Sequence, residues 1–153
     1  MAAAALLCAC SQVAYVRRST AVETGIPSPE QVAVLTRHRV AAGYDEAFGA
    51  LVELLQAQGC LVGTADKASG VVTAEQMFPD GSSLQPSIGE VRRMSFLLLP
   101  AGEDTELRLT IYIGMQQYAY GNPGAYYREE LGMATAPALY KAWFELLDGA
   151  VAR

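Results

Sequence analysis

The side chains that could support acid–base or nucleophilic chemistry are few and lie far apart in the sequence. His38 is the only histidine among the 153 residues, and no Ser, Cys or Asp stands near it in the sequence as a partner. Glu129 and Glu130 are adjacent, and neighbouring residues on a helix point in different directions, so they form a poor acid–base pair. No GxSxG, HExxH or phosphate-binding glycine loop is present. We therefore expect a protein that is not an enzyme and has no cofactor; a catalytic set scattered along the chain is the alternative.

The three cysteines do not form a metal or disulfide pattern. Cys8 and Cys10 are too close in sequence for a relaxed mutual disulfide. Cys60 opens an apolar segment, where a free thiol behaves as a small buried hydrophobic group. With a single histidine and no cluster of Cys and His, no metal site is expected.

Tyrosine is enriched in one segment near residue 120. Four of the eight tyrosines fall within ten residues, around a Gly-Asn-Pro-Gly turn. Tyrosine combines a large contact area with a polar tip and is favoured at protein interfaces. The candidate partner-binding residues are Tyr118, Tyr120, Tyr126 and Tyr127. The alternative is that some of them pack under the C-terminal helix while the others stay exposed.

The overall composition indicates one folded domain without a nucleic-acid partner. Hydrophobic residues make up 52% and charged residues 18% of the chain, which argues against intrinsic disorder over most of it. The formal net charge is -5, whereas nucleic-acid binding normally requires a basic patch. No apolar run approaches the roughly 20 residues of a membrane-spanning helix.

The chain begins with a short apolar stretch, MAAAALLCACS, which is rich in small residues. Within it, Leu7-Cys8-Ala9-Cys10 resembles the lipobox of bacterial lipoproteins, in which Leu at −3 and a small residue at −1 precede the lipidated cysteine. The resemblance implies a leader at 1–10, a lipid on Cys10 and an anchor in the bacterial cell envelope. Ser11 in the next position resembles lipoproteins of the outer membrane, so we expect its periplasmic face.

Two interpretations of this N-terminus remain open. No Lys or Arg precedes the apolar run, so under the lipoprotein interpretation we expect the natural start to lie upstream of Met1. The other interpretation is an Ala-rich tail with two incidental cysteines. Residues 11–31 are expected to form a flexible linker, because Pro27-Ser28-Pro29 should block regular structure. The folded domain is expected at 32–153.

Two helices are predicted in this domain, at 45–58 and 137–151. In the first helix, Phe48, Leu51, Val52 and Leu55 share one face. Pro137 suits the first turn of the second helix, in which Leu139 and Trp143 begin an apolar stripe. A short additional helix is expected at 126–133.

Strands are predicted at 35–40, 60–65, 71–75, 90–99 and 105–113. The clearest is the last, in which Leu107, Leu109, Ile111 and Ile113 alternate with more polar residues. The order β-α-β-β-β-β-α predicts a two-layer α+β domain, with an antiparallel sheet of about five strands covered on one face by the two helices.

The helix, glycine stop, strand, polar turn and strand of residues 44–75 look like domains of small bacterial envelope lipoproteins. The segment resembles the helix-grip-like domain of the lipoprotein C subunit of the outer-membrane β-barrel assembly machinery. This resemblance implies a non-enzymatic, membrane-anchored module for protein interaction or assembly, with an envelope protein as its partner. It would bind through a sheet edge or through the tyrosine segment. The alternative is a helix-grip-like carrier, in which Met94, Phe96 and Trp143 line a cavity for a small apolar ligand or lipid.

Overall fold

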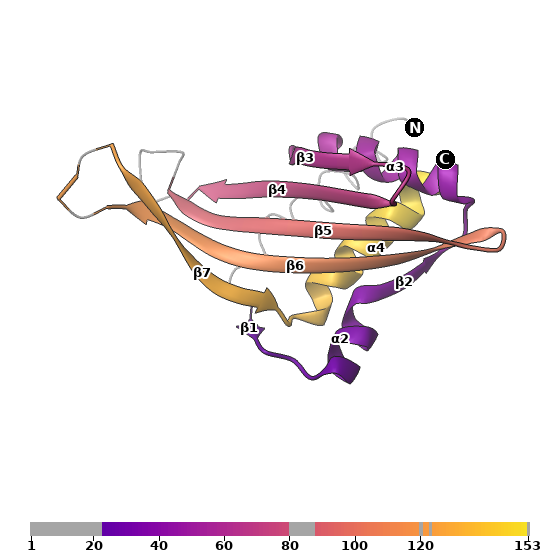
Figure 1. The fold of residues 1–153 in the computed structure, drawn as a ribbon, viewed down its shortest axis with the longest axis horizontal. Helices are drawn as coiled ribbons and strands as arrows, with labels where there is room; N and C mark the ends of the chain where they lie inside the picture. The colour runs from indigo at the N-terminus through magenta and orange to yellow at the C-terminus, as the bar shows by residue number, and fades with distance from the viewer. Residues whose placement is uncertain (1–22, 80–87, 120, 123, 153) are drawn as a thin grey trace, which may run out of the picture.

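The computed structural model describes residues 23–79, 88–119, 121–122 and 124–152 of the chain. This part has an α+β fold of mostly antiparallel sheet, with seven strands and three helices (Figure 1). In chain order the elements are β1 (Thr24–Gly25), α2 (Pro29–Thr36), β2 (Arg37–Val40), α3 (Tyr44–Ala57), β3 (Leu61–Asp66), β4 (Val71–Pro79), β5 (Gly89–Ala101), β6 (Asp104–Tyr118), β7 (Tyr126–Ala134) and α4 (Pro137–Val151).

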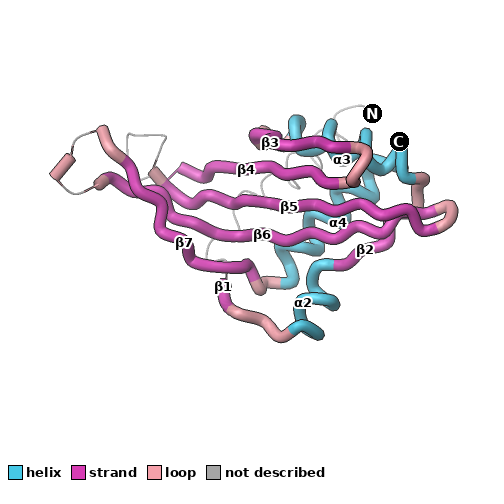
Figure 2. Tube along the Cα trace, viewed as in Figure 1, coloured by secondary structure: helices cyan, strands magenta, loops and turns pink. Residues whose placement is uncertain are grey.

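The strands form one antiparallel sheet in the order β1-β7-β6-β5-β4-β3, and β2 pairs with β6 in addition. β2 lies beside the first residues of β6, and β7 lies beside the later ones from Tyr112 onward. The same edge of β6 therefore pairs with β2 and then with β7. Figure 2 shows the long strands β4, β5 and β6 running side by side, with α3 and α4 behind them.

The two predicted main helices are confirmed. α3 covers Tyr44–Ala57 and α4 covers Pro137–Val151, close to the expected 45–58 and 137–151. The alternation predicted for residues 105–113 is also observed in β6. The four aliphatic side chains of that stripe are exposed by 1% or less and belong to the core, as do Leu51, Leu55 and Leu139 of the helices.

The expected strand number was too low, and the prediction for residues 126–133 was wrong. These residues form β7 instead of a short helix. Tyr126 to Glu130 pair with Tyr118 to Gly114, and the register shifts between Ile113 and Gly114. The Glu-Glu-Leu run has a good intrinsic helix propensity, but pairing with β6 supplies backbone hydrogen bonds to a distant segment and overrides it.

The described part of the expected linker, residues 23–31, contributes β1 and the start of α2. The Ser28 Oγ accepts a hydrogen bond from the Gln31 backbone N–H at 3.3 Å, and the Ser28 N–H donates to the Gln31 Oε1 at 2.8 Å. This reciprocal capping box, with Pro29 in the first helical turn, starts a helix. The expectation that the prolines block regular structure here was therefore wrong. The predicted strand at 35–40 is also shortened, because Leu35 and Thr36 end α2 and β2 begins at Arg37.

Candidate functional site: a groove and a tyrosine end

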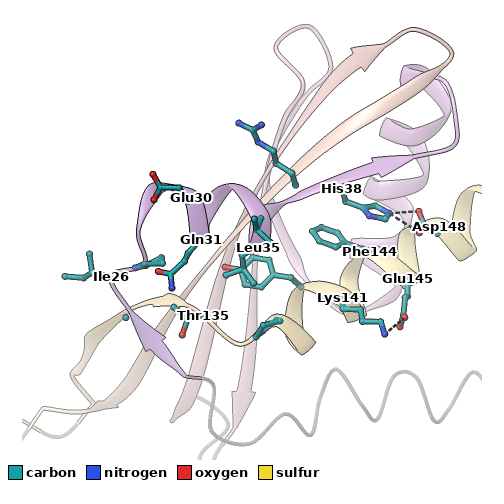
Figure 3. A pocket seen from close by; sticks show the side chains of 16 residues that line it. Ile26, Glu30, Gln31, Leu35, His38, Thr135, Lys141, Phe144, Glu145 and Asp148 are labelled. Atoms are coloured by element: carbon teal, nitrogen blue, oxygen red, sulfur yellow. Dashed lines mark hydrogen bonds and ion pairs between the residues drawn. The ribbon is translucent and has the colours of Figure 1, made fainter.

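An open groove of about 1020 Å³ lies between α2 and α4 and continues to β1 (Figure 3). Leu35, Tyr140 and Phe144 contribute apolar surface to its lining. Ile26 and Val34 also line it and are exposed by 102% and 85%. Concave, mostly apolar surfaces of this kind are the usual form of small-molecule binding sites.

The groove ends at a contact between an imidazole and a carboxylate. His38, on β2, lies with its Nε2 at 2.9 Å from both carboxylate oxygens of Asp148, on α4. The His38 ring stacks on Phe144, with ring centroids 4.6 Å apart and planes 6° apart. His38 and Asp148 are separated by 110 positions in the sequence, so no local spacing could have revealed the pair.

A carboxylate that holds an imidazole can orient it for proton transfer. In the part of the chain that the structure describes, however, His38 makes no hydrogen bond to a Ser, Thr or Cys that could serve as a nucleophile. We interpret the His38–Asp148 contact as a link that holds the end of α4 against β2.

The rim of the groove carries charges of both signs. Glu30 lies on α2, and Lys141 and Glu145 lie on α4 with an ion-pair distance of 3.6 Å between them. A backbone hydrogen bond at Glu30 and then a hydrogen bond from the Ser28 hydroxyl lower the pKa of the Glu30 carboxyl. Glu30 is therefore an anion at neutral pH, and it lies on the opposite wall of the groove from the cation of Lys141.

The structure brings three of the four predicted tyrosines together at one end of the sheet, where β6 ends and β7 begins. Tyr118 stacks on Tyr126, with ring centroids 5.1 Å apart. The Tyr127 hydroxyl donates a hydrogen bond to the Gln117 Oε1 at 3.2 Å. We call Tyr118, Tyr126 and Tyr127 the tyrosine end. Tyr120 lies outside the described residues.

Two of the three rings of the tyrosine end are exposed to solvent, whereas the hydroxyl of the third, Tyr118, is buried. Tyr126 and Tyr127 are exposed by 42% and 48%, so they are not core residues beneath α4. On the face of the sheet beside it, Arg128 forms hydrogen-bonded ion pairs with Glu75 at 2.9 and 3.0 Å. Arg93 pairs with Glu130 nearby. These cross-strand pairs tie β7 to β4 and β5, so the tyrosines are presented from an ordered strand.

Of the three cysteines, Cys60 alone belongs to the described residues. Cys10, the expected lipidation site, lies outside them, as does Cys8. Cys60 is buried, and desolvation raises the pKa of its thiol from the usual 9.0 to about 11. A thiol that stays protonated is a poor nucleophile, so Cys60 behaves as a core residue.

The three residues expected to line an interior cavity belong to the packed core. Met94, Phe96 and Trp143 are exposed by 1–2%. Phe96 and Trp143 meet edge to face, with ring centroids 6.2 Å apart. The groove between α2 and α4 lies outside this core, and these three residues do not line it.

Two further properties concern the described residues only. They contain no group of three or more His, Cys, Asp or Glu side chains arranged to hold a metal ion. No helix among them combines the length and the apolar character that a membrane span requires.

Comparison with known proteins gives no match to a family model, to a curated protein or to a solved structure.

One of the features missed in the sequence carried a readable signal. Ser28-Pro29-Glu30-Gln31 has the capping-box pattern, followed by the apolar run Val32 to Leu35. That pattern could have predicted α2, and with it one wall of the groove. The other wall, α4, was predicted, but nothing in the sequence indicates that the two helices face each other.

Proposed function

We propose that the protein is a non-enzymatic lipoprotein of the bacterial cell envelope, anchored through Cys10, that binds another envelope protein through the tyrosine end. The observation that carries the interaction part is the convergence of Tyr118, Tyr126 and Tyr127 at the end of the sheet. Large, half-exposed aromatic side chains on a rigid strand lose little conformational entropy on binding and are enriched at interface centres.

The anchor is supported by the lipobox-like residues Leu7 to Cys10. Thr24 is 14 positions after Cys10. At about 3.3–3.6 Å per extended residue, that length of chain spans at most about 50 Å. A domain tethered in this way could reach partners near the membrane surface.

The anchor is tested by the mass of the mature N-terminal peptide from protein expressed at its native locus, beside the Cys10→Ala variant. A diacylglyceryl-modified Cys10, with membrane association lost in the variant, is the expected result. An unmodified peptide beginning at Met1, from protein in the soluble fraction, would refute the anchor.

The interaction is tested by site-specific photocrosslinking from the tyrosine end. A benzophenone amino acid placed at Tyr127 should give a reproducible crosslinked partner, whereas the same group at Tyr112 should not. Tyr112 is the matched control because it is also a tyrosine in this sheet, exposed by 45% against 48% for Tyr127. Equal crosslinking at both positions, or none at Tyr127, would contradict the proposal.

A second candidate function, a carrier of a small apolar ligand or lipid, is favoured by one observation, the groove between α2 and α4. Its volume of about 1020 Å³ is at the upper end of the range typical of small-molecule sites. Native mass spectrometry of the purified protein tests this function. A co-purified small molecule that is released by Phe144→Asp would support a carrier, and a ligand-free mass would count against it.

A further inference from the structure

Strand β7 is an edge strand over most of its length. In the sheet it lies between β6 and β1, and β1 has only two residues. β1 pairs with Met133 and Ala134, at the end of β7, as Figure 1 shows. None of the other described strands pairs with this second edge of β7. Because the backbone N–H and C=O groups of a strand point alternately to its two edges, residues 127–131 present donors and acceptors to an edge that has no described partner strand.

This open edge is bounded, and it lacks the residues that usually block one. The pairing of β6 with β7 shifts register between Ile113 and Gly114, which leaves Leu131 as an extra residue that bends β7. Before this bulge, residues 127–130 contain neither proline nor lysine, which commonly protect a sheet edge. Tyr127 and Leu131, at the two ends of the stretch, are exposed by 48% and 41%. An open edge between two exposed apolar side chains is a surface that can accept a further strand.

The charges on β7 indicate what chemistry the added strand needs. Arg128 is paired with Glu75, and Glu130 is paired with Arg93. Glu129 lies between them and is exposed. It has no hydrogen bond or ion pair with any residue that the structure describes. Of the three consecutive charges on this strand, the carboxylate of Glu129 is therefore the one that the described chain leaves without a cation.

A strand paired with this edge would place its side chains directly opposite those of β7. Tyr127 and Glu129 are two positions apart and share one face of the strand. A complementary segment has a Lys or Arg opposite Glu129 and, two positions away, an apolar or aromatic residue opposite Tyr127. A second copy of this chain does not meet that requirement, because the symmetric pairing that overlaps all of residues 127–131 is centred on Glu129 and sets this carboxylate against its own copy.

We propose that the protein partner of the tyrosine end contributes an extended segment that pairs with the open edge of β7. A cationic side chain of this segment lies opposite Glu129, and an apolar one lies opposite Tyr127. Backbone hydrogen bonds to β7 supply the binding, and the contact with Glu129 sets the register. This inference rests on the proposed function and specifies how the partner is bound.

The test is amide hydrogen exchange of the full 153-residue chain, followed by NMR, with and without the peptide acetyl-TVTFTKTVT-amide as a probe. The Phe and the Lys of this peptide are two positions apart, as the proposed pairing requires. In the free protein, the amides of residues 127–131 that face the open edge should exchange rapidly. Saturating peptide should slow them by about 10-fold or more, because each amide then donates a hydrogen bond. The amides of β3, at the other end of the sheet, are the control and should not change.

A charge exchange tests the register. Replacing the Lys of the peptide by Glu should weaken binding by about 2- to 10-fold, because it opposes like charges across the strand pair. Glu129→Lys should restore the binding of the Glu peptide and weaken that of the Lys peptide. Glu103→Lys is the matched control, since Glu103 is an exposed glutamate in the turn between β5 and β6 and its variant has the same net charge. Far-UV circular dichroism confirms that each variant is folded.

Three results would overturn the proposal. Slow exchange of all amides of residues 127–131 in the free protein would show that the chain itself or a second copy already covers the edge. No binding of the Lys peptide up to about 2 mM would show that the edge does not accept a strand. Equal binding of the Lys and Glu peptides would exclude the contact with Glu129.

Failure of this inference can be told apart from failure of the proposed function. A partner that crosslinks from Tyr127 but leaves amide exchange at residues 127–131 unchanged would keep the proposed function and overturn the strand pairing. Slowed exchange with the Lys peptide, together with no crosslink from Tyr127 in the cell, would support the open edge as a strand-binding site and contradict the proposed function.

Discussion

Replacing Gly70 by alanine should show how tightly the turn between β3 and β4 is fitted against β5. Gly70 has a φ of 76°, in the left-handed region that costs other residues about 1–2 kcal/mol. A Cβ at this position would lie 2.2 Å from the backbone carbonyl oxygen of Leu98 and 3.2 Å from the Tyr44 hydroxyl. The backbones of Gly70 and Leu98 cannot move apart freely, because the Leu98 N–H donates a 2.9 Å hydrogen bond to the Gly70 carbonyl.

The expected loss of stability has two parts, the cost of a positive φ in the backbone and the cost of the clash between the new Cβ and Leu98. Gly102 has a nearly equal φ of 74°, and nothing lies within 4 Å of the position that a Cβ would take there, so Gly102→Ala measures the backbone cost. Gly70→Ala also displaces β5. This displacement weakens the hydrogen bond that the Leu98 N–H donates to the Gly70 carbonyl, at a cost of about 1 kcal/mol. It also strains a packed core region, at about 1–3 kcal/mol. We therefore expect Gly70→Ala to be less stable than Gly102→Ala by about 2 kcal/mol or more.

The assay is equilibrium unfolding in urea, followed by circular dichroism at one fixed protein concentration. The gain that alanine brings by restricting the unfolded chain is common to both variants and cancels in the difference. If the two free energies of unfolding agree within about 0.5 kcal/mol, the argument from close packing at Gly70 is refuted.

Three further predictions address burial and charge. The native protein should lose stability between about pH 9 and 11, because the folded state raises the pKa of the Cys60 thiol to about 11 and the unfolded chain ionises it at lower pH. Cys60→Ala should remove this loss, and unfolding titrations across that pH range measure the effect. Hydrogen bonds from the Ser69 side chain and then from the Ala68 backbone lower the pKa of Asp66 in the folded state. The stability that this carboxylate provides is fully present above its ordinary pKa of 3.8 and is lost as the pH falls through the lowered pKa. In Asp66→Asn, the free energy of unfolding should therefore depend less on pH in the acid range. Leu109→Ala should cost about 2–5 kcal/mol and Tyr112→Ala less than about 1 kcal/mol, since the first side chain is fully buried and the second is exposed by 45%; equal costs in urea unfolding would contradict the assigned faces of β6.

The correct predictions were those that depend on the spacing of apolar residues within a short segment. The apolar spacing of α3 and α4 and the alternation in β6 are visible within 10–15 residues, and the buried faces match them. The incorrect ones concern segments whose state depends on a distant partner. β7 has residues that favour a helix, but its hydrogen bonds go to β6.

The candidate sites divide in the same way. Counting tyrosines in the sequence identified the tyrosine end, because Tyr118, Tyr126 and Tyr127 are close along the chain as well as in space. The His38–Asp148 contact joins residues 110 positions apart and could not be predicted.

The sequence by itself determined the α+β class, the two long helices and the segment in which aromatic side chains gather. These follow from composition and from periodic burial, which are properties of a short stretch of chain. Only the tertiary structure decided that residues 126–134 form a strand of the sheet, that the tyrosines lie at the end of a strand pair, and that α2 and α4 face each other across a groove. Each of these depends on which distant segments meet, and many alternative pairings would satisfy the same local pattern equally well.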